Sequence, residues 1–267
     1  MKKLEILDKV KQDNVRSLVR ERYGQVAKQE SSCCASPGCC GPSPNASLEL
    51  GYSEKDLAAV PDGANMGLGC GNPQAIAALK PGEVVLDLGA GGGFDCFLAA
   101  KRVGKKGRVI GVDMTPDMLS KARLNAKTAK ATNVEFRLGE IEHLPVADGE
   151  VDVIISNCVI NLSPDKAAVF HEAFRVLRKG GRIAISDVVA TGKMPRALAK
   201  DVAALTGCVA GAAQVKELQA MLAEAGFKAI DVDVSEESRA FIREWFPGTG
   251  AEKYVASAKI TARKPLR

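Results

Sequence analysis

Apolar residues along the chain follow two alternating patterns, which together predict a sheet covered by helices. Short apolar runs of strand length lie at 84–88, 108–113, 134–138, 151–156 and 182–187. Amphipathic stretches of helical spacing separate most of them, beginning at Phe94 and covering 116–130 and 165–177. Buried strands that alternate with helices are typical of a parallel sheet covered on both faces. We therefore predict a doubly wound α/β domain with a mostly parallel sheet.

The pattern continues on both sides of this domain. Leu4, Leu7, Val10, Leu18 and Val19 recur at helical spacing, which predicts an amphipathic helix ending near Gly24. A short helix is expected at 74–79. Beyond the domain we expect a helix at 214–225, a strand at 228–234 and a last strand near 254–260.

These elements divide the chain into four parts. Residues 1–30 form an N-terminal helix, and residues 31–50 form a linker. Five Ser, three Pro, two Gly and four Cys lie within 31–47, a composition that favours neither helix nor strand. Residues 51–195 form a Rossmann-like domain, and residues 196–267 complete the sheet and contribute to the substrate site.

Composition and charge exclude several classes of protein. No apolar run approaches the roughly 18–20 residues that a membrane span needs. The net charge is only +5, and the basic residues are scattered, so no nucleic-acid-binding surface is indicated. Charged residues at Asp8, Lys9 and Lys11 interrupt the N-terminus where a secretory signal would be apolar. We expect a cytoplasmic protein with neither a membrane nor a nucleic-acid partner.

A glycine-rich loop follows the first predicted strand. It contains Gly89, Gly91 and Gly93, and it lies at the carboxyl end of a central strand, where open α/β sheets bind ligands. Twenty residues after Gly93, the second strand ends in Asp113, where a carboxylate reaches the hydroxyls of an adenosine ribose. Asp87 precedes the loop and would repel a pyrophosphate. A cationic sulfonium with an amino-acid tail fits better, so we expect S-adenosylmethionine as the cofactor.

Position in the chain suggests further cofactor contacts. Met114 follows the second strand and can lie beside the adenine or ribose. Glu140 and Ile141 follow the third strand, where the edge of an adenine would be read, and Asn157 closes the fourth. For Glu140 and Asn157, a role as an ordinary turn-capping residue is an equal alternative.

The eight cysteines are the unusual feature of this composition. Four lie in the linker, and Cys96 is expected to be a small buried apolar residue. Cys158 follows the fourth strand and should face the methyl-donor end of the cleft. Cys70 and Cys208 each lie beside glycines, which should leave their thiols accessible. The chain has only two histidines, His143 and His171, which we expect at the surface, so histidine-based chemistry has little support.

Four segments together resemble the arsenite S-adenosylmethionine methyltransferases. These are Gly67-Leu68-Gly69-Cys70-Gly71-Asn72-Pro73, Gly111-Val112-Asp113-Met114-Thr115-Pro116, Ser156-Asn157-Cys158-Val159-Ile160-Asn161-Leu162 and Gly207-Cys208-Val209-Ala210-Gly211-Ala212. The resemblance implies a class I methyltransferase fold with a C-terminal substrate-binding extension. It also implies that Cys70, Cys158 and Cys208 are catalytic and hold trivalent arsenic, whose lone pair attacks the methyl group of the cofactor.

The resemblance further implies that arsenite arrives free or as its glutathione conjugate, and that glutathione or thioredoxin serves as thiol reductant. A fourth, N-terminal cysteine takes part in the redox step in this family. Here Cys33, Cys34, Cys39 and Cys40 all compete for that role.

Two other functions remain open at this point. A small-molecule methyltransferase of the quinone-biosynthesis type would share the glycine loop and Asp113, but it leaves the cysteines unexplained. Alternatively, the linker cysteines sequester a thiophilic metal, and the methyltransferase fold is secondary.

Overall fold

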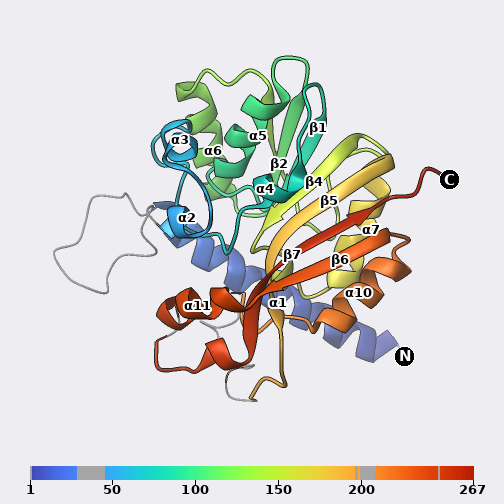
Figure 1. Ribbon diagram of the computed structural model, residues 1–267. Helices are drawn as coiled ribbons and strands as arrows, with labels where there is room; N and C mark the ends of the chain where they lie inside the picture. The colour runs from blue at the N-terminus through green and yellow to red at the C-terminus, as the bar shows by residue number, and fades with distance from the viewer. Residues whose placement is uncertain (1, 29–45, 196–197, 199–207, 246) are drawn as a thin grey trace.

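A seven-stranded sheet forms the centre of the molecule (Figure 1). The computed structural model describes residues 2–28, 46–195, 198, 208–245 and 247–267. The strand order is β3-β2-β1-β4-β5-β7-β6, and only β7 runs antiparallel to its neighbours. The strands are β1 Val84–Leu88, β2 Arg108–Asp113, β3 Val134–Leu138, β4 Val151–Asn157, β5 Leu177–Ala190, β6 Lys228–Ser235 and β7 Val255–Arg263. The predicted mostly parallel α/β fold is therefore confirmed.

Helices cover both faces of the sheet. Those described are α1 Lys2–Lys28, α2 Ala46–Glu49, α3 Glu54–Ala58, α4 Pro73–Ala77, α5 Phe94–Val103, α6 Pro116–Thr128, α7 Lys166–Val176, α10 Val215–Glu224 and α11 Arg239–Trp245. Single 3-10 turns lie at Ile160–Leu162 (η1), Glu236–Ser238 (η2) and Ala251–Lys253 (η3).

Neighbouring residues of the central strands supply two separate cores. In β4, Ile154 packs with the core that contains α7 and α10, whereas Val153 and Ile155 pack with the core that contains α5 and α6. In β5, Ile183 and Ala184 divide in the same way. Successive side chains of a strand point to opposite faces, so a run of apolar residues buries both. This is why the continuous apolar runs in the sequence predicted the strands well.

Helix α1 crosses one end of the sheet, from the side of α10 to the side of α2 (Figure 1). The prediction that it ends near Gly24 was wrong, because the helix continues to Lys28. A Cβ atom at Gly24 would lie 3.0 Å from Oδ2 of Asp117. The glycine therefore permits a close approach of α1 to α6 and does not mark a helix end.

Other boundaries also differ from the sequence prediction. Strand β5 begins at Leu177, five residues before the expected start, and passes through Gly180 at a positive φ of 80°. Residues 46–49 of the expected linker form α2. Cys33, Cys34, Cys39 and Cys40 lie outside the described residues. No helix in the described part of the chain combines the length and apolar character needed to span a bilayer.

Candidate active site

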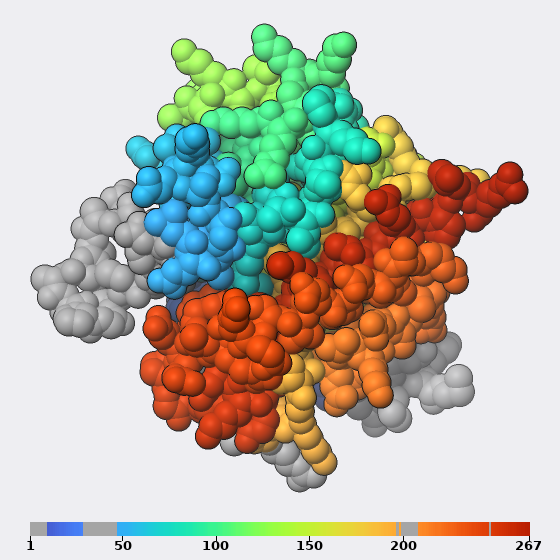
Figure 2. Space-filling view, viewed as in Figure 1, coloured from blue at the N-terminus to red at the C-terminus, as the bar shows by residue number. Residues whose placement is uncertain are grey.

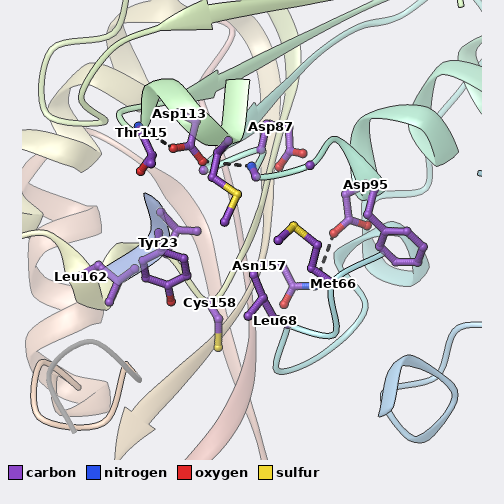
Figure 3. A pocket seen from close by; sticks show the side chains of 18 of the residues that line it. Tyr23, Met66, Leu68, Asp87, Asp95, Asp113, Thr115, Asn157, Cys158 and Leu162 are labelled. Atoms are coloured by element: carbon purple, nitrogen blue, oxygen red, sulfur yellow. Dashed lines mark hydrogen bonds between the residues drawn. The ribbon is translucent and has the colours of Figure 1, made fainter. Parts of the chain in front are cut away.

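An open cleft lies at the carboxyl ends of β1, β2 and β4. Helix α1 and the segment from α2 to residue 69 form its remaining walls. In Figure 3, Asp87 and Asp113 lie on one side of the cleft and Cys158 lies opposite, with Tyr23 and Leu162 near it. The cleft thus occupies the position at which parallel α/β sheets bind ligands.

The glycine loop gives the cleft its tight wall. Gly89 has a positive φ of 69°, and a Cβ there would lie 2.4 Å from Cγ2 of Val159. Each carboxylate oxygen of Asp113 accepts a hydrogen bond from a backbone amide. Gly91 N donates to Oδ2 at 2.9 Å, and Thr115 N donates to Oδ1 at 2.8 Å. One carboxylate therefore fixes the glycine loop and the end of β2 relative to each other.

Two buried aspartates lie behind the loop. Asp95 accepts a 2.8 Å hydrogen bond from the Tyr52 hydroxyl and a longer one of 3.4 Å from Gln74 Nε2. Cys96 is fully buried, as predicted, and its thiol donates to Asp87 Oδ2 at 3.2 Å. Burial raises the pKa of the Asp87 carboxyl well above its usual value, and the charge of Asp95 raises it further. Burial also raises the pKa of Asp95.

Asn157 links this acidic region to the loop that carries Cys70. Its Oδ1 accepts a hydrogen bond from Cys70 N at 3.0 Å. Its Nδ2 donates to Gly71 O at 2.9 Å and to the Tyr52 hydroxyl at 3.1 Å. The last residue of β4 thus positions the backbone beside the first of the three cysteines.

Most of the expected cofactor residues line the cleft. Gly93 and Glu140 do not. Gly93 is the N-cap of α5 at a positive φ of 92°, and Glu140 accepts ion pairs from Arg16 and Arg20 of α1 at 3.3 Å each. The expected residues that do line it are Asp87, Gly89, Gly91, Asp113, Met114, Ile141 and Asn157.

Several lining residues were not predicted from the sequence, among them Arg16, Tyr23, Tyr52 and Asp95. Arg16 and Tyr23 reach the cleft from α1, and Tyr52 and Asp95 meet across 43 positions of the chain. An amphipathic pattern reveals which face of α1 is apolar, but not which element that face covers. The position of Asp95 in the first turn after the glycine loop was the one available signal.

The three candidate cysteines converge beside the cleft. Cys70 and Cys158 form a disulfide with a Cα–Cα distance of 5.7 Å, and Cys208 is a free thiol that donates to the backbone carbonyl of Cys158 at 2.7 Å. Cys158 lines the cleft. The expectation that Cys70 and Cys208 are accessible was wrong: they are 2% and 3% exposed. Gly69 and Gly71 let Asn157 and Ser186 pack closely against the loop that carries Cys70. Cys208 is buried among the apolar residues of the same cluster.

Cys158 and Cys208 both adopt left-handed backbone conformations, with φ of 57° and 66°. For residues with a side chain this region is unfavourable, and such strain persists where the surrounding structure enforces it. Hydrogen bonds enforce it at Cys158, whose N donates to Ser186 O at 2.8 Å. A glycine would fit either position more easily, so each of these two cysteines is present despite an unfavourable backbone conformation.

Apolar side chains from the C-terminal part of the chain surround the cysteines. Ile242 of α11, Ala251 of η3 and Val255 of β7 belong to the same buried cluster as all three. Figure 2 shows the C-terminal residues, in orange and red, as a continuous layer over the lower part of the molecule. Burial raises the pKa of the Cys208 thiol well above its usual value, and the nearby Asp187 carboxylate raises it further.

The charges that line the cleft favour a cation. Among the described residues, the lining contains four acidic side chains, Asp87, Asp95, Asp113 and Glu142, and one basic side chain, Arg16. Buried carboxylates without balancing charge are unfavourable, so a positively charged ligand would stabilise this arrangement. A thiophilic acceptor bound to the cysteines would lie next to such a ligand.

Comparisons with known proteins place this chain among related sequences and structures. Residues 79–226 match a family described as "Methyltransferase domain". A protein of Halobacterium salinarum named arsenite methyltransferase is 54% identical over 265 residues, covering 96% of this chain and 68% of the relative. One of Aquipseudomonas alcaligenes with the same name is 39% identical, covering 78% of this chain and 61% of the relative, so this chain is shorter than both. The crystal structure of CrArsM, an arsenic(III) S-adenosylmethionine methyltransferase from Chlamydomonas reinhardtii, is 33% identical, with a TM-score of 0.60 over 85% of this chain and 74% of that one.

Proposed function

Because this chain belongs to the arsenite methyltransferase family, among the class I methyltransferases, we propose that it transfers methyl groups from S-adenosylmethionine to trivalent arsenic. The observation that carries the proposal is the convergence of Cys70, Cys158 and Cys208 in one buried cluster, with Cys158 on the wall of the cleft. The products would be methylated arsenicals, and the role would be arsenic detoxification.

The cleft fits S-adenosylmethionine, which supplies an electrophilic methyl group when bound. We assign the ribose hydroxyls to Asp113 and the cationic end to the region of Asp87, whose raised pKa marks an uncompensated buried carboxylate. Gly89 and Gly91 let the loop backbone approach the ligand, while Met114 and Ile141 offer apolar contacts. In this arrangement Glu140 acts indirectly, by holding α1 through Arg16 and Arg20.

The cysteines would bind, orient and dehydrate the arsenic. Three thiols displace the three hydroxides of arsenite, and each thiol proton leaves with a hydroxide as water. Neutral thiols, which a raised pKa of Cys208 favours, are therefore suitable reactants for this exchange. Soft thiolates suit a soft centre such as As(III), and three of them leave its lone pair directed away from the sulfurs. Positioning that lone pair toward the methyl group is the main contribution of the protein.

The disulfide between Cys70 and Cys158 supports a requirement for a thiol reductant. In this form only Cys208 of the three offers a thiol. Two electrons and two protons must enter to restore the pair, and two thiols of glutathione or thioredoxin supply them while forming a disulfide of their own. We place the reaction in the cytoplasm, where thiols are kept reduced, with arsenite entering free or as its glutathione conjugate. One of Cys33, Cys34, Cys39 and Cys40 would relay electrons.

The other two functions explain fewer of these observations. A methyltransferase of the quinone-biosynthesis type would use the cleft, but this function does not explain why two cysteines in left-handed conformations lie beside it. A sequestration module built on the linker cysteines gives no reason for a cleft with this glycine loop.

The test is arsenite methylation by the reduced protein with S-adenosylmethionine and glutathione, with arsenic species separated by chromatography. Wild type is compared with Cys158→Ser and with Cys96→Ser. Cys96 lies outside the cysteine cluster, and a serine there can still donate to Asp87. We expect methylated arsenic from wild type and Cys96→Ser, and none from Cys158→Ser. If wild type binds S-adenosylmethionine but yields no methylated arsenic, the acceptor is a different compound.

A further inference from the structure

A carboxylate lies within reach of two of the three cysteine sulfurs. The sulfurs of Cys70 and Cys158 and a carboxylate oxygen of Asp187 all lie within 4.8 Å of one another, and all three residues are buried. Among the described residues, Cys208 is not part of this group, since its thiol is directed to the Cys158 carbonyl. The arrangement therefore offers two sulfurs and one oxygen, a different ligand set from three sulfurs.

Two thiolates and one carboxylate match the preferences of a borderline divalent cation. Tetrahedral zinc, with bonds of about 2.3 Å to sulfur and about 2.0 Å to oxygen, holds its ligand atoms roughly 3.5–3.8 Å apart. Reduction of the disulfide frees the two sulfurs to separate, and side-chain rotation would then bring the set to that spacing. We propose that reduced Cys70 and Cys158, together with Asp187, form a Zn²⁺ site, with water from the cleft as fourth ligand.

Hydrogen bonds fix the orientation of the Asp187 carboxylate. Oδ1 accepts from Val188 N at 2.7 Å and from Asn161 Nδ2 at 2.9 Å, and Oδ2 accepts from Ile160 N at 2.9 Å. Outer partners of this kind orient metal ligands and strengthen metal binding. Asp187 therefore has the support expected of a ligand before any metal arrives.

The charge balance of the site also suits a divalent cation. Two thiolates and a carboxylate carry three negative charges, so the site with Zn²⁺ bound has a net charge of −1. The Lys166 ammonium interacts electrostatically with Asp187 and offsets the remaining charge. A buried site with this balance avoids the large penalty of isolated charge.

Metal binding requires the dithiol form. A phosphine reductant converts the Cys70–Cys158 disulfide and one water into two thiols and a phosphine oxide. Zn²⁺ then replaces the two thiol protons, which are released to solvent. Zinc and arsenite would compete, because both use Cys70 and Cys158. The zinc site does not rest on the arsenic assignment, since it needs neither Cys208 nor the cofactor.

The experiment uses the full chain with Cys33, Cys34, Cys39 and Cys40 replaced by serine, which removes thiols that would bind metal elsewhere. Phosphine-reduced protein is titrated with Co²⁺, whose thiolate charge-transfer and visible bands report tetrahedral sulfur coordination. We expect one equivalent bound. Asp187→Asn should lower the affinity by at least about tenfold, the least that loss of an outer-sphere partner costs. Cys208→Ser should leave it unchanged.

A second measurement avoids dependence on the Asp187 variant, which also removes support from Ile160 and Asn161. X-ray absorption of the zinc-loaded protein counts ligands directly, and we expect two sulfurs with the remainder oxygen. Three sulfurs, loss of Co²⁺ binding in Cys208→Ser, or no binding by the reduced protein would each overturn the site. None of these outcomes affects whether the chain methylates arsenite, which the chromatographic test decides.

Discussion

The thiol of Cys208 lies 2.7 Å from the backbone carbonyl oxygen of Cys158 and donates a hydrogen bond to it, although 50 positions of the chain separate the two residues. The contact joins the end of β4 to the segment before α10. It keeps a third sulfur beside the disulfide without a covalent bond. The geometry of the proposed arsenic site thus depends on a contact that the hydroxyl of a serine at 208 could also make.

Because a side-chain donor makes this contact, the structural role of Cys208 can be tested separately from its chemical role. A serine at 208 can donate the same hydrogen bond but cannot bind arsenic as a soft ligand. We expect Cys208→Ser to lower the rate of arsenite methylation at least about hundredfold, as loss of positioning at a reacting centre does. Its affinity for S-adenosylmethionine, measured by calorimetry, should match wild type. A variant that methylates at the wild-type rate would remove Cys208 from the reaction.

Asp113 should matter for the cofactor and not for the substrate. Its carboxylate holds Gly91 and Thr115 and is assigned to the ribose hydroxyls. Hydrogen bonds to a charged group contribute about 1.5–3 kcal/mol, so Asp113→Ala should weaken S-adenosylmethionine binding by roughly 10–100-fold. Arsenite binding to the reduced protein, followed by quenching of Trp245 fluorescence, should persist. Equal loss of both would show that Asp113 acts elsewhere.

Arg16 should be the main attachment of α1 to the cleft. It is 7% exposed and pairs with Glu140 and with the buried Glu142, both at 3.3 Å. Removing one partner of a buried ion pair leaves an uncompensated charge, and here Arg16→Met should lower the free energy of unfolding by about 3–5 kcal/mol.

Arg20 provides the matched control, because it pairs only with Glu140 among the ion pairs seen and lies closer to solvent. An exposed pair contributes roughly 0–1 kcal/mol, so Arg20→Met should change stability little. Urea unfolding of both variants gives the comparison. Similar free energies of unfolding for the two variants would mean that burial of Arg16 does not increase the contribution of its ion pairs to stability.

Asp87 should make the cofactor-free protein less stable as pH rises. Burial and the charge of Asp95 raise its pKa well above the usual value. Between the unfolded pKa near 3.8 and the higher folded pKa, the folded state keeps a proton that the unfolded state has lost, so the free energy of unfolding falls with increasing pH. Each unit of difference corresponds to about 1.4 kcal/mol.

The corresponding variant is Asp87→Asn, which cannot ionise. Urea unfolding without cofactor should show a larger gain in stability over wild type at pH 8 than at pH 5. An equal gain at both values would mean that Asp87 titrates as an ordinary carboxyl. S-adenosylmethionine affinity should fall in this variant at both pH values.

The sequence specified the sheet more completely than the site. The strand starting at Val84 and the one ending at Asp113 were predicted to the residue, because buried apolar runs depend on local composition. The predicted helix end at Gly24 was wrong because this glycine serves a tertiary contact, the close approach of α1 to Asp117. Asp187 gave no signal at all, since its nearness to Cys70 arises only when β5 lies beside the cysteine loop.

The position of β7 between β5 and β6 determines when the last part of the sheet can form during folding. Strand β6 precedes β7 in the chain but pairs only with it, while β7 separates β6 from β5. During synthesis β6 therefore has no sheet partner until residues 255–263 have been made. An unpaired strand of this kind can join a neighbouring molecule. A chain that ends before residue 255 would thus present β6 without its sheet partner, and such a chain should aggregate more readily than one that includes β7.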